Sequence, residues 1–267
     1  MLELFAAGFF LRALLGGALI ALTAALVGVF IVLRRQAMIG DGIAHVSIAG
    51  VALGFLIHLY PIGVGLAFAV AASLAIEALR RAYRTYAELS IAVIMAGGIA
   101  LASLFFTMGM GFSVNVTSYL FGSIYTLDDT DLAVIAAITA AVLAFALVFQ
   151  KELFLLAFDE DAAAVNGLPV RVFNVLVSVL TAFVISAAIK IVGALLVSAL
   201  LTIPAACALA MARSFRQALG LAVAAGEIAV LLGLFVAGWW NLAPGGTVVL
   251  LLIAMLALAL ATRKLRV

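Results

Sequence analysis

Long apolar runs dominate this chain and limit what it can fold into. A run of about 20 apolar residues is long enough to cross a bilayer as a helix. Such runs cover residues 4–33, 39–58, 62–79, 88–107, 131–149, 170–189, 191–210, 217–238 and 244–262. Hydrophobic residues make up 69% of the sequence, whereas a soluble globular chain is about half apolar. The alternating pattern of a membrane β-barrel is absent from the sequence. We therefore expect an all-α integral membrane protein, a polytopic bundle of about nine transmembrane helices.

Basic residues set the orientation of these predicted spans. Arginine or lysine follows every second span, in the stretches 34–35, 80–84, 151–171, 213–216 and 263–266. Because loops rich in Lys and Arg stay in the cytoplasm, nine spans place the N-terminus outside. Eight spans remain possible if the sixth and seventh are irregular around Lys190. We expect residues 1–267 to form a single transmembrane domain in the cell (inner) membrane, in contact with lipid and without a nucleic-acid partner.

Two connections are longer than a membrane hairpin requires. Residues 108–130 form an external, semi-polar segment that ends in acidic residues. Residues 158–171, FDEDAAAVNGLPVR, lie on the cytoplasmic side. Asp159 and Glu160 suit the start of a helix, where acidic side chains favour the helix dipole. Gly167 suits its end, so we expect a short helix in this segment.

Two ionisable residues lie inside the second predicted span, within MIGDGIAHVSIAGVALG at 38–54. Asp41 and His45 are four residues apart and therefore share one face of a helix. A carboxylate oxygen and an imidazole nitrogen together suit a borderline divalent cation such as zinc. Gly50 and Gly54 fall roughly on the opposite face, where they permit close helix packing. The pattern favours a helix that lines a path and presses its back against a neighbour.

Structural roles for this pair remain open at this point. Asp41 lies just inside the membrane from Arg34 and Arg35, so it could cap the helix or pair with either arginine. His45 could form a hydrogen bond with a carbonyl of a neighbouring helix. Against these roles, ionisable groups inside membranes usually mark a transport pathway. Two donors are too few for a complete metal site, which needs groups from other spans or from a second copy of the chain.

Two glutamates are further candidates for the transport path. Glu227 lies in the middle of the eighth predicted span, away from both of its loops. Glu88 opens the fourth span directly after a basic loop, which favours charge pairing. Asp41 and Glu227 would be relay groups if the chain were an ion-coupled secondary carrier. The inverted repeats that would support a carrier are not evident in the sequence.

The sequence lacks the motifs of an enzyme or an ATPase. It contains no G-x-x-x-x-G-K-[ST] phosphate-binding loop, and its only lysines are Lys151, Lys190 and Lys264. It contains no nucleophile triad and no H-E-x-x-H motif. We therefore expect a pore or carrier that binds no cofactor. A divalent metal ion would be its transported substrate, and a partner would hydrolyse any ATP.

Four motifs occur in the order found in one family of transporters. They are MIGDGIAHVSIAGVALG, VTSYLFGSIYTL, FDEDAAAVNGLPV and IKIVGALLVSALLTIPAACALA. With these motifs, residues 8–262 closely resemble the permease family of zinc and manganese ABC importers, and AHVSIAGVALG looks more like the zinc-uptake branch. The resemblance implies a homodimer of permease subunits seated on two cytoplasmic ATPase subunits. It also implies an extracytoplasmic metal-binding protein that delivers the ion.

The resemblance assigns roles to individual residues. Asp41 and His45 match the Asp and His that are implicated in metal handling in the family's second span. The segment DEDAAAVNG looks like the coupling helix of ABC permeases, with an EAA-like arrangement at Glu160, Ala163 and Gly167. A short helix there would seat in a groove of the ATPase and move with its nucleotide state.

The sequence departs from the family pattern in two places. The fourth span begins AELSIAV with Glu88, where the family usually has an Asp and a Gly-containing run. The turn before the last span reads NLAP with Asn241, where an acid often precedes the Pro. Both departures leave the identity of the metal open. A permease for an iron–siderophore or a cobalamin is a related alternative, although such permeases usually have an extra N-terminal span and no D-x-x-x-H motif.

Overall fold

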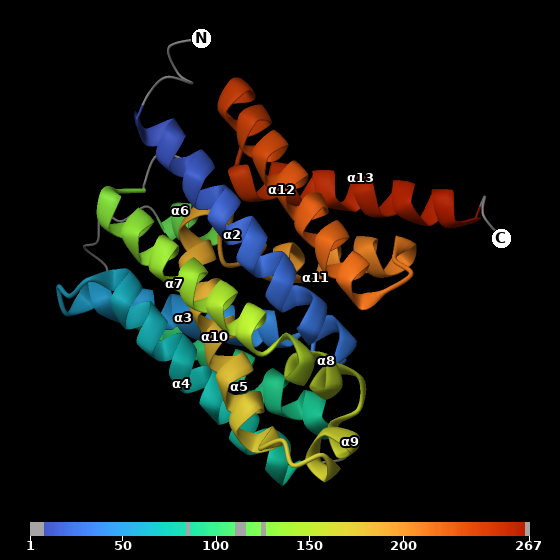
Figure 1. Cartoon of the computed structure of the whole chain (residues 1–267). Coiled ribbons are helices and arrows are strands. Elements are labelled where there is room, and N and C mark those ends of the chain that lie inside the picture. Colours follow the sequence, from blue (N-terminus) through green and yellow to red (C-terminus); the bar gives the residue numbers. More distant parts are fainter. Residues whose placement is uncertain (1–7, 84–85, 110–115, 124–126, 265–267) are drawn as a thin grey trace.

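The structure is a computed structural model that describes residues 8–83, 86–109, 116–123 and 127–264. Within these residues every regular element is a helix, which confirms the all-α expectation. The helices are α2 (Gly8–Leu33), α3 (Ile39–Leu56), α4 (Pro61–Ala82), α5 (Ala87–Met108), α6 (Val116–Phe121), α7 (Asp129–Val148), α8 (Gln150–Phe158), α9 (Glu160–Val165), α10 (Val170–Val192), α11 (Val197–Met211), α12 (Phe215–Trp240) and α13 (Pro244–Lys264). Figure 1 shows a bundle from which α13 extends away.

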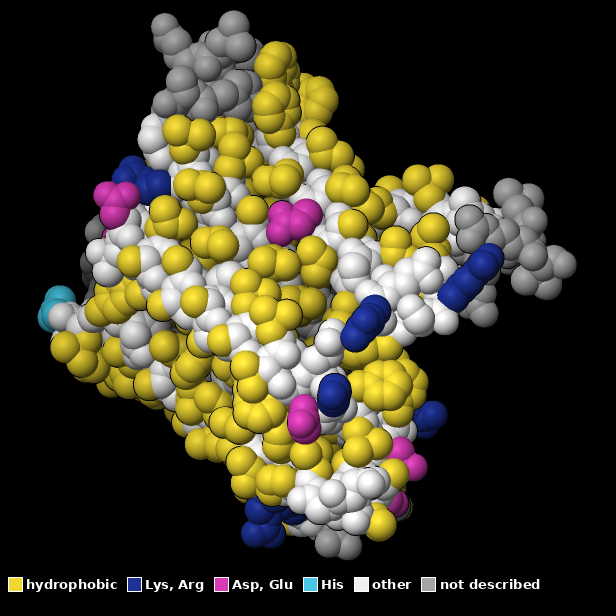
Figure 2. Space-filling view, in the orientation of Figure 1, with side chains coloured by type: hydrophobic (Ala, Val, Ile, Leu, Met, Phe, Trp, Pro, Cys, Tyr) yellow, Lys and Arg dark blue, Asp and Glu magenta, His cyan; other side chains and the backbone are white. Residues whose placement is uncertain are grey.

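Eight of the described helices are long and apolar enough to cross a membrane. They are α2, α3, α4, α5, α7, α10, α12 and α13, and each coincides with one of the predicted spans. Long helices form because a backbone in lipid has to satisfy its own hydrogen bonds. Hydrophobic side chains cover most of the face shown in Figure 2, and most Lys and Arg in that view lie in its lower half. The expectation of a multi-pass membrane protein is confirmed.

The seventh predicted span, residues 191–210, is the irregular one. Helix α10 runs on to Val192, and Gly193 then adopts a left-handed φ of 87°. A Cβ atom on Gly193 would lie 2.4 Å from the carbonyl oxygen of Leu120, so only glycine fits this backbone and this close approach. After the turn, α11 has 15 residues, which is too short to span a bilayer alone. The irregularity expected around Lys190 therefore falls at Gly193.

The stretch from Gly193 to Phe215 nevertheless crosses the bundle. Lys190, in the last turn of α10, forms an ion pair with Asp131 at the start of α7. Phe215 lies at the other end, where its ring centroid is 5.6 Å from that of Phe30 in the last turn of α2. The described chain thus runs between the two ends of the bundle with eight long helices that are candidate membrane spans, and once more with this turn and α11. The two span counts considered from the sequence, nine and eight, therefore differ only in whether this turn and α11 are counted as a span.

The two ends of the bundle differ in charge. We call one the basic end, which comprises residues 34–36, 80–83, 149–171 and 212–216. We call the other the opposite end, which comprises residues 57–60, 127–131, 190–193 and 241–245. The positive-inside rule predicts that the basic end faces the cytoplasm.

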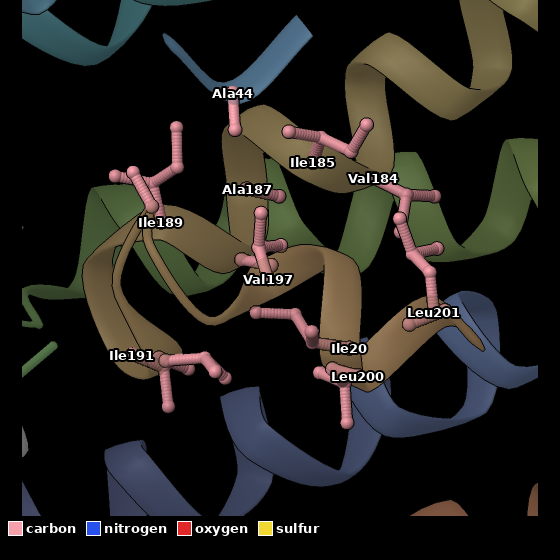
Figure 3. Packing of buried hydrophobic residues seen from close by; sticks show 14 of the residues in the cluster. Ile20, Ala44, Val184, Ile185, Ala187, Ile189, Ile191, Val197, Leu200 and Leu201 are labelled. Carbon is pink, nitrogen blue, oxygen red and sulfur yellow. The ribbon is translucent and has the colours of Figure 1, made fainter. Parts of the chain in front are cut away.

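The core lies where α2, α3, α10 and α11 meet. Figure 3 shows Ile20 of α2 beside Leu200 and Val197 of α11, with Ile185 of α10 and Ala44 of α3 in the same cluster. All five side chains are at most 1% exposed. Because lipid tails are as apolar as these side chains, the stabilisation comes from close van der Waals packing. This core fixes one side of α3.

A buried ion pair closes the opposite end. Asp131 is 2% exposed, and its carboxylate contacts Nζ of Lys190 and accepts a hydrogen bond from the Tyr60 hydroxyl at 2.6 Å. Asp128 and Asp131 also cap α7 reciprocally, since each side chain accepts from the other's backbone N–H. Burial, followed by the hydrogen bond to Asp131, raises the pKa of Tyr60 above its usual value, so Tyr60 remains a donor. The cluster ties the α3–α4 turn to α7 and α10.

Candidate functional site

Helix α3 carries both residues of the predicted metal pair. Asp41 lies in its first turn, near the basic end, and His45 lies one turn further along. Both side chains are partly exposed. Neither forms a hydrogen bond or an ion pair with any part of the chain that the structure describes. An ionisable group without a partner is costly inside a membrane protein, so these two side chains are candidates for contact with a ligand.

The glycine face of α3 packs against α4, as the sequence predicts. A Cβ atom on Gly50 would lie 2.7 Å from Cβ of Phe68. A Cβ atom on Gly54 would lie 2.7 Å from Cα of Pro61. Only hydrogen at these positions allows the two helices to come this close. The metal pair lies roughly on the far side of the helix from this contact.

The structural roles considered for Asp41 are not found among the described residues. The N-cap of α3 is Met38, and no side chain caps this helix. Arg34 forms its ion pair with Glu160, at 3.3 Å between Nη2 and Oε2. Within the described residues Arg35 forms no ion pair. Asp41 therefore does not cap the helix and does not neutralise any arginine of the described part of the chain.

Helix α5 presses on α3 directly behind His45. A Cβ atom on Gly98 would lie 2.7 Å from the backbone nitrogen of Val46 and 2.9 Å from the carbonyl carbon of His45. Gly97, by contrast, faces open space. A glycine at position 98 thus sets the backbone position of His45, a contact that the sequence alone did not predict. The Gly-Gly pair in an apolar run was the available signal, but spacing alone does not tell which glycine faces α3.

The other two candidates lie apart from the metal pair. Glu227 is partly buried in α12 and has no hydrogen bond or ion pair within the described chain. Glu88 is exposed and lines a pocket of about 740 Å³ at the basic end, together with Arg34, Arg35 and Arg80. The charge pairing expected for Glu88 is not found among the described residues. The described residues contain no group of three or more His, Cys, Asp or Glu that could hold a metal ion, so Asp41 and His45 alone do not complete a metal site there.

The segment 158–171 forms the expected short helix, α9. Asp159 is its N-cap, and the Asp159 side chain accepts a hydrogen bond from the backbone N–H of Ala162 at 2.8 Å. Gly167 follows the helix with a φ of 82°, a conformation that glycine adopts without strain. The local sequence is therefore sufficient to define both ends of α9.

The predicted coupling residues point in different directions. Ala163 is fully buried and packs in a small cluster with Leu156 and Phe173, which attaches α9 to α8 and α10. Glu160 makes contacts within the chain, described below. Val165 is 88% exposed at the end of α9. The exposed surface of α9 therefore includes Val165, whereas Ala163 holds the helix in place.

Part of the predicted external segment, residues 108–130, is described, and it packs on the turn after α10. The backbone N–H of Ala194 donates to the carbonyl of Tyr119 at 3.0 Å. The backbone N–H of Ser123 donates to the carbonyl of Lys190, also at 3.0 Å. This part of the segment is therefore bound to the irregular seventh pass.

Comparisons with known proteins identify the family. The model described as "ABC 3 transport family" matches residues 6–263. A "Probable metal transport system membrane protein" of Treponema pallidum (strain Nichols) is 32% identical over 253 residues, covering 95% of each chain. The "Manganese import system permease protein ScaB" of Streptococcus gordonii is 30% identical over 242 residues, covering 91% of this chain and 87% of the relative.

A solved structure has a similar fold. The structure titled "PsaBC from Streptococcus pneumoniae in complex with Fab" matches with a TM-score of 0.87 and 29% sequence identity, covering 100% of both chains. The family match covers nearly the whole sequence, and its boundaries include all helices from α2 to α12. The chain is a multi-pass, non-enzymatic membrane permease that belongs to the ABC 3 transport family.

Proposed function

We propose that this permease imports a divalent transition-metal ion, driven by ATP that a partner subunit hydrolyses. The observation that carries the proposal is the pair Asp41 and His45 on a membrane helix, a carboxylate and an imidazole that have no partners among the described residues. The names of the two curated relatives refer to metal and to manganese, which supports this class of substrate. Membership of the family implies an ATPase and a substrate-binding partner.

A partial metal site suits transport better than a closed one. A conducting site must bind the ion well enough to accept it and weakly enough to release it. Four protein ligands around zinc form a structural site that holds its metal. We propose that two copies of the chain form a homodimer, in which each copy contributes Asp41 and His45 and the ion passes between them.

The metal we propose first is zinc, with manganese as the second candidate. The sequence of the second span resembles the zinc-uptake branch, and an imidazole ligand suits zinc. The name of one curated relative specifies manganese, and a carboxylate ligand suits manganese. Both ions fit a pair of one oxygen and one nitrogen donor, so uptake has to be measured for each.

The partners would bind at opposite ends of the bundle. The exposed face of α9, including Val165 at the basic end, would contact the ATPase. The opposite end would receive a metal-binding protein that delivers the ion from outside. This arrangement agrees with the orientation that the positive-inside rule predicts.

The test is metal uptake in cells that carry the wild type or His45→Ala, with zinc, manganese and iron offered separately. His58 is the matched control, since it is the second of two histidines and is exposed at the opposite end. It has a φ of 55°, so His58→Asn suits that backbone better than Ala. We expect uptake of the transported metal to fall about tenfold or more in His45→Ala, because loss of a group that only supports a metal ligand already lowers affinity or activity by about that factor. The effect of His58→Asn should be much smaller.

The pattern across the metals decides between the candidates. Loss of zinc uptake alone, with the variant still present in the membrane, would support both the site and the zinc assignment. Loss of manganese or iron uptake would keep the site and change the substrate. Unchanged uptake of every metal that the wild type transports would exclude His45 as a ligand.

A further inference from the structure

The side chain of Glu160, at the start of α9, turns into the chain. Its Oε1 atom accepts a hydrogen bond from the side-chain amide of Asn174 at 2.7 Å. Its Oε2 atom lies 3.3 Å from Nη2 of Arg34. Asn174 belongs to α10 and is 6% exposed, and Arg34 directly follows α2. One carboxylate therefore joins α9 to two membrane-spanning helices.

Arg34 is the buried partner in this link. Its side chain is 7% exposed, compared with 47% for Glu160. Burial lowers the pKa of the Arg34 guanidinium from its usual value, and the charge of Glu160 opposes this shift. A buried charge that loses its partner is strongly destabilising. Separating Glu160 from Arg34 would therefore leave a buried guanidinium without its ion-pair partner.

The turn that contains Arg34 leads directly into the metal pair. The backbone N–H of Gln36 donates to the carbonyl of Ile31 at 2.9 Å, and the N–H of Ile39 donates to the carbonyl of Gln36 at 2.9 Å. Helix α3 begins at Ile39 and carries Asp41 in its first turn. Because the turn is short and hydrogen-bonded, a displacement of Arg34 would also displace the start of α3.

The same turn is tied to α4. With the Gln36 amide assigned so that its oxygen faces Arg80, this oxygen accepts hydrogen bonds from both terminal nitrogens of Arg80, at 2.8 and 2.9 Å. Arg80 also forms an ion pair with Glu77 at 3.2 Å. Helix α4 packs on the glycine face of α3. The turn before α3 is therefore joined to the helix that supports α3.

We propose that Glu160 and Arg34 are positioning residues that transmit the movement of α9 to Asp41 and His45. The inference rests on the proposed function, in which α9 contacts the ATPase. Nucleotide-driven displacement of α9 moves Arg34 through Glu160, shifts the start of α3 and changes access to the metal pair. Neither positioning residue contacts the ion.

The test uses the complete complex of permease, ATPase and binding protein in proteoliposomes, with zinc or manganese and ATP supplied. The single variants are Glu160→Gln and Arg34→Gln, and the swapped variant combines Glu160→Arg with Arg34→Glu. Arg35→Gln is the matched control, because Arg35 is adjacent, exposed and without an ion pair within the described residues. Metal uptake and ATP hydrolysis are measured on the same preparation.

Each single variant should lower the metal transported per ATP hydrolysed about tenfold, a usual magnitude for coupling between sites. ATP hydrolysis should stay close to the wild-type rate. The swapped variant should recover most of the lost transport, and Arg35→Gln should match the wild type. A parallel loss of uptake and hydrolysis in the single variants, or a swap no better than either of them, would overturn the inference.

A second readout does not depend on transport and uses variant complexes that retain ATP hydrolysis. A cysteine introduced as Met38→Cys in a Cys207→Ala background reports changes in the accessibility of the turn. Position 38 is 57% exposed. Nucleotide should change its rate of maleimide labelling in the wild-type background and should have no effect in Glu160→Gln. An unchanged rate in the wild-type background, or a change that survives Glu160→Gln, contradicts the inference.

The two proposals fail in different ways. If the wild-type complex transports none of the metals, the proposed function fails, and the labelling experiment still decides whether Glu160 connects α9 to the turn. If metal is transported and the single variants remain coupled, only the positioning role fails.

Discussion

At the scale of single residues, the charges inside this bundle differ in whether they have a partner. Asp131 pairs with Lys190, and Glu77 pairs with two arginines of its own helix. Asp41 and His45 have no partner within the described chain. A buried ionisable group needs compensation for its lost hydration. The paired groups find it in the fold, whereas Asp41 and His45 are partly exposed and would find it in a bound ion if the proposed function is correct.

Removing the charge of Asp131 should destabilise the protein. In Asp131→Asn the ammonium of Lys190, whose side chain is 12% exposed, would lose its carboxylate while it stays buried. The expected loss is about 3 kcal/mol in the free energy of unfolding. Thermal unfolding of the purified protein in detergent measures the change.

Asp129→Asn is the matched control on the same helix. Asp129 forms an ion pair with Arg12 at 2.8 Å, but its side chain is 86% exposed, and such surface pairs contribute less than about 1 kcal/mol. We therefore expect a much smaller decrease in Tm. Equal decreases for the two variants would mean that burial does not govern the strength of these pairs.

At the scale of elements, α3 is held on two sides by glycine contacts. Gly50 and Gly54 bring it against α4, and Gly98 brings α5 against its backbone beside His45. The core around α10 and α11 fixes a further side. A helix held in this way presents its remaining face in a defined position, as a site that orients two ligands requires.

Replacing Gly98 should disturb the site as well as the packing. In Gly98→Ala the new methyl group would overlap the backbone of α3, because the Cβ position is 2.7 Å from the nitrogen of Val46. Overpacking of this kind costs about 1–3 kcal/mol, and the shift of α3 should also lower metal uptake. Thermal unfolding and uptake assays test the two effects.

The neighbouring substitution Gly97→Ala provides the control. Nothing lies within 4 Å of a Cβ atom there, and alanine is the better helix former by up to about 1 kcal/mol. Gly97→Ala should therefore keep or raise Tm and leave uptake unchanged. If both variants behaved alike, the contact between α5 and α3 would not be the cause of the lower stability and uptake.

At the scale of the whole molecule, the number of crossings depends on the irregular seventh pass. Gly193 lies at the opposite end of the bundle, and Phe215 lies at the basic end. The segment between them has one short helix. If this segment crosses the membrane, the loop after α11 lies on the same side as α9.

Cysteine labelling of whole cells tests this topology. In a Cys207→Ala background, an impermeant maleimide should label His58→Cys at the opposite end and should not label Val165→Cys at the basic end. Arg213→Cys should behave like Val165→Cys, because an odd number of crossings separates it from His58. Labelling of Arg213→Cys from outside would instead mean that the seventh pass turns back.

The sequence by itself determined the positions of the long helices and the face of the metal pair. Apolar runs become helices in lipid because the backbone has no water to bond with. Asp41 and His45 share a face because the helical period is a local property. The ends of α9 also follow from local signals, since Asp159 caps the helix and Gly167 adopts a left-handed φ.

Only the tertiary structure decided how these elements act on one another. It turned Glu160 toward Arg34, 126 positions away in the sequence, and it selected Gly98 rather than Gly97 as the contact behind His45. The break at Gly193 likewise depends on the backbone of Leu120, from a distant segment. Such contacts join residues that no local period relates, because they arise from packing whole helices together.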